Sequence, residues 1–379
     1  MRFAAPLLLI APLAQAAEPA PAFGRYLPLY PGLYADAGFT VDAGDRAFTQ
    51  SGARADSATP GDGIDVKFPQ TRAQVDFTWT FPMFESRDLP FFSDRLHTLR
   101  IALPYLQSQA KDLSGGAGSG IGDARLEFGS FLYGSQDWRT RPDTPLAVLL
   151  LAGISVPTGS YDPDAPVNAG DNHYAWSATL GAHWRPWSGG FVEAGAGYRW
   201  NERNHEPAYG ALAPAREGDV QLYDFSFTQR VLPNLYAGLF FADREGARDL
   251  YVNPRAAPNA PVPPGGASNA PVAGRYHDDG TALRRLGLQL HGFLTQRWML
   301  SASYAHPLAG KSGEFSLPFE NRTPAGCIPG ALTCAVSAGG TVREDGLGAA
   351  RVFASDSFGL SLTYSFGQGD AYTCVGCRR

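Results

Sequence analysis

The chain has 379 residues and a formal net charge of -5. This charge argues against a nucleic-acid-binding protein, which would carry a basic face, and we expect no nucleic-acid partner. The 44 glycines, 30 prolines and 12% aromatic residues favour β-structure with many turns, in one large domain or two smaller ones.

The first element in the chain is an expected secretory signal peptide, Met1–Ala16. Arg2 supplies its positive start, Phe3–Ile10 is apolar, and Ala14-Gln15-Ala16 forms an A-x-A cleavage site. This segment is too short to span a membrane, and no later stretch approaches the ~20 apolar residues of a membrane helix. We therefore expect an exported protein without a helical span. The segment that follows, residues 17–32, is either periplasmic or a plug inside a barrel.

Twelve strands follow, each recognised by apolar and polar side chains that alternate along the chain. The last strand shows the pattern most clearly, since aromatic residues or leucines alternate with Ser, Gly and Thr. Two strands have local irregularities: Leu146–Val156 begins apolar on both faces, and Pro104 predicts a bulge or frayed pairing. The twelve are Leu33–Asp42, Arg72–Phe81, His97–Tyr105, Asp123–Tyr133, Leu146–Val156, His173–Trp184, Phe191–Asn201, Val220–Val231, Leu235–Asp243, Ala282–Gly292, Arg297–Ala305 and Ser357–Phe366.

The connections between these strands alternate in length. Those after odd-numbered strands are long, with Arg244–Thr281 and Pro307–Ala354 expected as the longest loops. Those after even-numbered strands are short or medium. Outer-membrane barrels have long extracellular loops and short periplasmic turns, whereas a soluble sandwich has no reason for this alternation.

The tryptophans support the same interpretation. Trp79, Trp184 and Trp298 fall on apolar faces at one end of their strands, and Trp176 and Trp200 at the other, which predicts two aromatic girdles. The predicted fold is all-β: a transmembrane antiparallel up-and-down β-barrel over residues 33–366, with about 12 strands (roughly 10–14) and its apolar face toward lipid. We expect it in the outer membrane of a Gram-negative bacterium, with membrane lipid and the barrel-assembly machinery as partners.

The polar faces of the strands would line the lumen and carry charges of both signs. Such a lining has two interpretations: a solvated or mutually paired interior that packs the barrel, or a charged passage that selects solutes. The predicted lumen-lining residues are Asp36, Arg72, Asp76, Arg100, Arg125, Glu127, Glu193, Arg199, Asp224, Arg285, Gln289 and His291.

The four cysteines lie late in the chain. Cys327 and Cys334 bracket a short loop, and an oxidising compartment favours a disulfide between them. Cys374 and Cys377 form a C-x-x-C in the tail 367–379, without the βαβ context of a thioredoxin-like motif. Structural disulfides, cross-pairing and metal or redox chemistry stay open for them.

The sequence offers little for catalysis. The histidines show no zinc-binding spacing, and we predict no catalytic, cofactor-binding or metal-binding residues. One remote alternative is a hydrolase, because His291 and Ser301 or Ser303 fall on neighbouring strands. Small polar residues are nonetheless what a lumen contains in any case.

Three stretches carry a resemblance to a known family. They are Gly24-Arg25-Tyr26-Leu27-Pro28, the Gly-x-Gly-Asp of Gly120–Asp123, and Val156-Pro157-Thr158-Gly159-Ser160-Tyr161-Asp162. Together they resemble the outer-membrane family named for the MetA pathway of phenol degradation. The resemblance implies a barrel that passes hydrophobic or aromatic compounds, and it supplies no catalytic residues.

These observations predict a passive outer-membrane channel for small solutes that needs no cofactor. The main alternative is a plugged, structural barrel that acts through its long extracellular loops. Phe366 is similar to the aromatic residue that usually ends such chains and serves as their assembly signal. The identity of the solute, the state of the lumen and the oligomeric state are not specified by the sequence.

Overall fold

A computed structural model of the chain describes residues 25–26, 31–43, 46–48, 54–56, 69–82, 95–109, 117–134, 145–163, 168–207, 214–253, 268–271, 274–278, 280–322, 342–350 and 355–366. The expected signal peptide, the four cysteines and the tail 367–379 lie outside these residues. Within the described part, no helix is long and apolar enough to cross a membrane.

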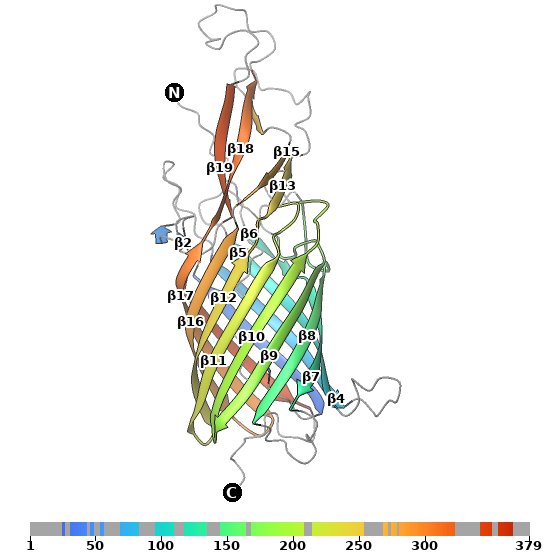
Figure 1. Ribbon diagram of the computed structural model, residues 1–379, viewed down its shortest axis with the longest axis vertical. Helices are drawn as coiled ribbons and strands as arrows, with labels where there is room; N and C mark the ends of the chain where they lie inside the picture. Colours follow the sequence, from blue (N-terminus) through green and yellow to red (C-terminus); the bar gives the residue numbers. More distant parts are fainter. Residues whose placement is uncertain are drawn as a thin grey trace, which may run out of the picture.

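Twelve long antiparallel strands of the described chain close into one barrel (Figure 1). Each pairs with the barrel strand before and after it, and the last pairs with the first, so the up-and-down topology is confirmed. All twelve predicted strands are present. They are β1 (Gly32–Asp42), β4 (Gln70–Pro82), β5 (Leu96–Gln109), β7 (Ala124–Tyr133), β8 (Leu146–Val156), β9 (Ala175–Trp187), β10 (Gly190–Asn201), β11 (Val220–Leu232), β12 (Leu235–Gly246), β16 (Thr281–Phe293), β17 (Trp298–Lys311) and β20 (Ser357–Ser365).

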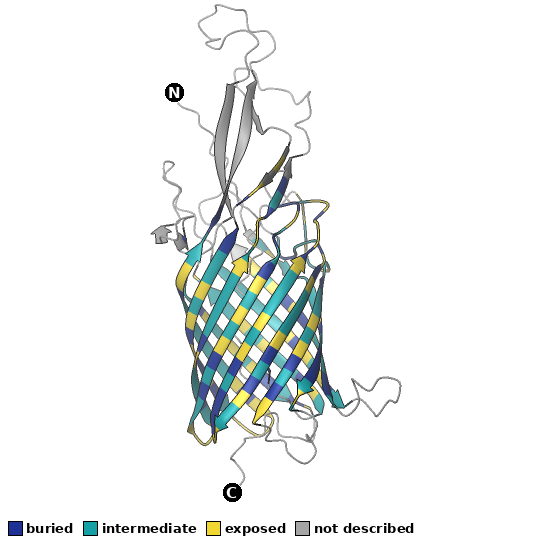
Figure 2. Ribbon diagram, in the orientation of Figure 1, coloured by how far each residue is buried: buried dark blue, intermediate teal, exposed yellow. Residues whose placement is uncertain are grey.

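The outer face of the barrel is the apolar one. On β4, Phe77 and Trp79 are 41% and 50% exposed, whereas Asp76 and Thr80, which flank this pair, are 7% and 0% exposed. Figure 2 shows the same alternation of exposed and covered residues along the strands. A soluble sandwich would show the reverse, so these are the lipid-facing and lumen-facing sides of an outer-membrane barrel.

Aromatic side chains ring the two ends of this apolar band. Trp79, Trp184 and Trp298 are exposed at the end with the short turns, and Trp176 and Trp200 at the other end. The Trp176 indole N–H donates to Glu202 over 2.8 Å, just above the strand. Amphipathic rings with their polar atom turned outward are typical of membrane interfaces, and both predicted girdles are present.

The long connections contain strands of their own, which the sequence did not predict. Proline and glycine interrupt the alternation there, as at Pro307, where the register of β17 shifts against β16. Figure 1 shows β13, β15, β18 and β19 rising from one end of the barrel. The added strands are β2 (Arg46–Phe48), β3 (Arg54–Asp56), β6 (Ala117–Ile121), β13 (Leu250–Asn253), β14 (Ser268–Pro271), β15 (Gly274–His277), β18 (Gly313–Arg322) and β19 (Val342–Ala350).

The predicted irregularity at Pro104 is also present. β5 pairs with β7 up to Ala102, then with β6 from Tyr105 onward, in a register shifted by one residue. The Pro104 carbonyl, which lies within the shift, accepts from the Gly122 N–H over 2.8 Å. The nitrogen and carbonyl of a strand residue face the same neighbour, so the missing N–H of the proline falls where the pairing is interrupted.

Candidate functional site

The twelve predicted lumen residues all lie on the strand faces opposite the exposed apolar side chains. Polar residues that alternate with apolar ones in the sequence therefore lie on the opposite face of each strand. The structure separates them into a wall of charged side chains, a wall with glycines and Tyr26, and smaller groups near the two ends.

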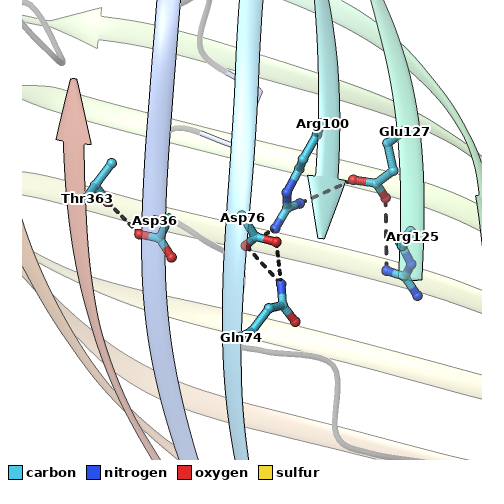
Figure 3. Close-up of polar contacts among 7 residues, drawn as sticks. All are labelled: Asp36, Gln74, Asp76, Arg100, Arg125, Glu127 and Thr363. Carbon is cyan, nitrogen blue, oxygen red and sulfur yellow. Dashed lines mark hydrogen bonds and ion pairs between the residues drawn. The ribbon is translucent and has the colours of Figure 1, made fainter. Parts of the chain in front are cut away.

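The charged wall is formed by β1, β4, β5, β7 and β20 (Figure 3). Arg100 lies at its centre, with its guanidinium 2.8 Å from Asp76 and 3.2 Å from Glu127. Gln74 donates from its amide nitrogen to both oxygens of Asp76 at 2.8 Å. Arg125 extends the group, 4.0 Å from Glu127. The charges on this wall thus satisfy one another.

The pairing register explains why Arg100 is needed. Asp36 on β1 stands directly opposite Asp76 on β4, an unfavourable pair of like charges. Arg100 offsets this repulsion, because it approaches Asp76 from β5 while also facing Glu127 on β7. The Thr363 hydroxyl donates to the Asp36 carboxylate over 2.6 Å from β20.

A second wall, which adjoins the first where β7 pairs with β8, is formed by β8, β9, β10 and β11. Four residues stand side by side across these strands in one row: Leu149, Gly181, Gly195 and Asp224. The two glycines leave the middle of the row without side chains. Tyr26 fills the space, since a Cβ atom added to either glycine would overlap the tyrosine side chain.

Tyr26 is held there by polar and apolar contacts. Its hydroxyl donates to Asp224 over 2.7 Å, and its backbone N–H donates to Glu193 over 3.3 Å. Glu193 also lies 3.2 Å from His183. The ring is 0% exposed and packs in a cluster with Leu96, Phe131, Ala147 and Leu149.

Two further ion pairs occupy the end of the lumen that carries the long connections. Arg199 lies 3.3 Å from Asp171, and Arg285 lies 3.7 Å from Asp42. Arg72 faces the lumen from β4 at the same end. The mouth therefore carries charges of both signs.

Near the short-turn end, the Gln289 amide donates to Thr228 over 2.8 Å. His291 Nδ1 lies 2.9 Å from the Ser301 hydroxyl, so the pair considered for a hydrolase is in contact. A serine nucleophile also needs a third group that orients the histidine and donors for the oxyanion. The contact between His291 and Ser301 supplies neither. Within the described residues, no group of three His, Cys, Asp or Glu side chains is placed to hold a metal ion.

The two strand-end motifs, Gly120–Asp123 and Val156–Asp162, meet at Asp123. The Asp123 carboxylate accepts the Gly159 N–H on one oxygen and the Asp171 N–H on the other, both over 2.8 Å. The Thr158 hydroxyl accepts the Ala124 N–H over 3.0 Å. Motifs separated by more than thirty residues thus form one hydrogen-bonded group, which we call the Asp123 cluster. It attaches the connection between β8 and β9 to the bulge between β6 and β7.

Asp123 lies beyond the membrane-spanning strands and is partly shielded from water. Burial, and next the negative charge of Asp171, raise the pKa of Asp123 to about 6, against the two backbone hydrogen bonds and His173, which lower it. The Asp123 cluster therefore contains a carboxyl group that changes its charge near physiological pH.

Two of these features were not predicted as site residues. Tyr26 was noted only within a motif of the family resemblance, and Asp123 only within another such motif and as the start of a strand. One signal for the tyrosine was available: β8 begins apolar on both faces, so its inner residues Ala147 and Leu149 needed something apolar to cover them.

Comparisons with known proteins agree with this geometry. A family model described as "Putative MetA-pathway of phenol degradation" matches residues 44–253, more than half of the chain. The COG4313 outer membrane channel from Pseudomonas putida F1 superposes with a TM-score of 0.59 at 12% identity, covering 90% of this chain and 98% of that chain. At this identity the likeness shows the fold alone. No sequence among the curated proteins matches the chain.

Two further solved structures resemble the chain less closely. The TodX monoaromatic hydrocarbon channel (deltaS2 mutant) gives a TM-score of 0.36 at 8% identity, over 88% of this chain and 90% of that chain. A Pseudomonas aeruginosa FadL homologue gives 0.34 at 11% identity, over 89% and 91%.

Proposed function

This chain belongs to the family described as "Putative MetA-pathway of phenol degradation", and on that basis we propose that it is an outer-membrane channel for the passive passage of small hydrophobic or aromatic solutes. The family membership and the barrel fold support this proposal. Lipid would surround the barrel, the solute would pass through the lumen, and no cofactor or catalytic residue takes part.

The observation that carries the proposal is the chemistry of the inner wall. Charged and polar side chains from β1, β4, β5 and β7 line the inside of a closed barrel, and they pair with one another along the wall. An eight-strand barrel is filled by its own side chains, whereas the space inside grows with strand number. A twelve-strand barrel with a polar lining is suited to admit water and small molecules.

The glycine-containing wall is where we place the path of the solute. The side chains described on the charged wall are held in ion pairs and hydrogen bonds, whereas the space over Gly181 and Gly195 is filled by Tyr26 from outside the barrel strands. Withdrawal of Tyr26 would open this side of the lumen without breaking any strand pairing.

A second candidate function is favoured by the same tyrosine. With Tyr26 buried against the wall, the segment preceding β1 acts as a plug, and the protein serves as a closed barrel that works through its extracellular strands and loops. The predicted plug within residues 17–32 is thus supported by one residue inside the barrel.

One experiment separates the two functions. The folded mature chain, with and without Glu18–Pro31, is reconstituted into liposomes, and swelling is measured in solutes of increasing size. A channel gives swelling in both forms, faster after the deletion. Swelling only after the deletion supports the plugged barrel, and its absence in both folded forms contradicts a channel.

A further inference from the structure

The place occupied by Tyr26 has the form of a binding site for a phenol. We define the tyrosine seat as Phe131, Leu149, Gly181, Gly195 and Asp224, which lie in one row across β7, β8, β9, β10 and β11. We propose that this seat binds small phenolic solutes, and that Tyr26 is the chain's own phenol, which occupies the seat until a solute displaces it. The inference rests on the proposed channel function and names its substrate class.

The order of residues along the row matches the order of atoms in a phenol. Phe131 and Leu149 form the apolar end and are 1% and 2% exposed. A Cβ atom at Gly181 would overlap ring carbons of Tyr26, and one at Gly195 would overlap its hydroxyl oxygen. Asp224 follows next in the row and accepts the hydroxyl hydrogen over 2.7 Å. Across the strands, the seat thus provides apolar side chains, then a flat floor, then a hydrogen-bond acceptor. This spatial order matches the ring and hydroxyl group of an aromatic alcohol.

The floor is built for a ring at this place. Gly181 and Gly195 are directly paired across β9 and β10, so a patch two strands wide lacks side chains. Glycine weakens a strand and marks the close approach of another group. By contrast, a Cβ atom at Gly38, on the inner face of β1, would meet its nearest neighbour at 3.6 Å, an ordinary contact.

The chemistry of Asp224 sets the preference within aromatic compounds. A carboxylate accepts a hydrogen bond from a neutral phenol, and a hydrogen bond to a charged group is among the stronger ones. Toluene offers no hydroxyl donor and cannot replace the hydrogen bond that Tyr26 makes to Asp224. A phenolate or benzoate would place a negative charge beside Asp224 and Glu193. The seat therefore selects neutral aromatic alcohols over hydrocarbons and aromatic anions.

Tyr26 competes with such a solute from within the same chain. A tethered group has an effective concentration on the order of millimolar, so a solute must bind well or be abundant to replace it. Displacement couples binding to opening, because the tyrosine that leaves the seat also leaves the lumen wall. Solute recognition and access to the lumen are then one event.

The test uses p-cresol, which reproduces the tyrosine side chain, and toluene, which lacks the hydroxyl. Binding of both is measured by equilibrium dialysis against the folded, full-length protein in detergent. We expect Tyr26→Ala to bind p-cresol roughly tenfold or more tightly than the unaltered chain, because the tethered competitor is gone. We expect p-cresol to bind this variant about tenfold or more tightly than toluene.

Two double variants show whether binding occurs at the seat. On the Tyr26→Ala background, Gly181→Ala places a methyl group where the ring lies and should abolish p-cresol binding. Gly38→Ala on the same background is the matched control and should leave binding intact. Asp224→Leu on that background should remove the preference for p-cresol over toluene. If Tyr26→Ala does not fold, the chain lacking Glu18–Pro31 provides the same empty seat.

Equal binding of p-cresol and toluene to the emptied seat would overturn the proposal, and so would p-cresol binding that survives Gly181→Ala. Because dialysis requires no transport, this outcome is distinct from failure of the channel. Liposome swelling without p-cresol binding would contradict the phenol site and support the channel. Binding of p-cresol without swelling would support the site and contradict the channel.

Discussion

The two walls of the lumen differ in which residues fill the inner face of the barrel. On the charged wall, Arg100 is paired with Asp76 and Glu127 from adjacent strands, so the lining is complete within the sheet. On the glycine-containing wall, Gly181 and Gly195 supply no side chains, and the space is filled by a residue 198 positions before Asp224. The ion pairs of the first wall are thus made between barrel strands, whereas the second wall is completed by Tyr26, a residue that precedes the barrel strands. A lumen built this way has one fixed side and one replaceable side.

The largest effect is expected from Arg100→Ala on the charged wall. The change leaves Asp76 and Glu127, whose side chains are 9% and 8% exposed, without their shared cation. Removing one partner of a buried ion pair costs about 3–5 kcal/mol, and the partial exposure of Arg100 places the expected loss of unfolding free energy at the lower end. Urea unfolding in lipid vesicles, followed by tryptophan fluorescence, measures it.

Arg284→Ala is the control for that measurement. Arg284 pairs with Asp243 and Glu245 on the outer side of the barrel, where its side chain is 49% exposed. Solvent screens exposed pairs, which contribute little to stability, so this variant should unfold almost like the unaltered chain. Equal losses in the two variants would contradict the fixed, self-paired character of the charged wall.

On the replaceable side, Gly195→Ala should change permeation more than stability. The added methyl group would overlap the Tyr26 hydroxyl and crowd the Asp224 carboxylate. We expect the tyrosine to be displaced, because it takes no part in the strand pairing of the barrel. We expect a several-fold rise in single-channel conductance, with a loss of unfolding free energy of no more than about 1–3 kcal/mol from the crowded site.

Gly38→Ala, on the inner face of β1, is the matched control for Gly195→Ala. Its methyl group would meet Ser361 at 3.6 Å and needs no rearrangement. Its conductance should equal that of the unaltered chain in the same planar-bilayer recordings. A rise in both variants would mean that any lumen methyl group disturbs the barrel, and the distinction between the walls would fail.

The sequence predicted the charged residues of both walls, but neither their contacts nor Tyr26. Period-two alternation placed Asp76, Arg100 and Asp224 on the lumen face, because each strand alternates by geometry. Alternation does not fix the register between strands, so the contacts of Arg100 could not be derived. Tyr26 was out of reach for a stronger reason: the segment that carries it has no period, and its partners are 167 and 198 residues away.

The Asp123 cluster connects the charged wall to the glycine-containing wall, because it attaches the connection that leads into β9 to the end of β6, which pairs with β5. Burial and the charge of Asp171 raise the pKa of Asp123 to about 6. The state in which the cluster is formed therefore binds a proton more tightly than the state in which its hydrogen bonds are broken. The stability of the cluster is then greatest below about pH 4, the ordinary pKa of the carboxyl group, and is lost as pH rises through 6.

Hydrogen exchange at the Gly159 and Asp171 amides, which both donate to Asp123, measures this effect. After correction for the intrinsic pH dependence of exchange, protection should fall from about pH 4 to about pH 7, the range set by the ordinary and the raised pKa, and then stay level. In Asp123→Asn the group no longer titrates, and protection should stay flat over that range. A similar fall in the variant would contradict the assignment of the pH dependence to Asp123.

The smallest effect is expected from Tyr26→Phe, and it divides the role of the tyrosine into its two parts. The ring stays on the glycine floor, so the cluster with Phe131 and Leu149 is kept, while the hydrogen bond to Asp224 is lost. Such a loss costs about 1–3 kcal/mol for docking of the segment, with no change in unfolding of the barrel itself. Conductance should show more frequent openings of unchanged size, because the same group leaves the same space more often. An increase in the size of the openings would mean instead that Asp224 is moved by the loss, and the seat would then be shaped by the tyrosine rather than ready for a solute.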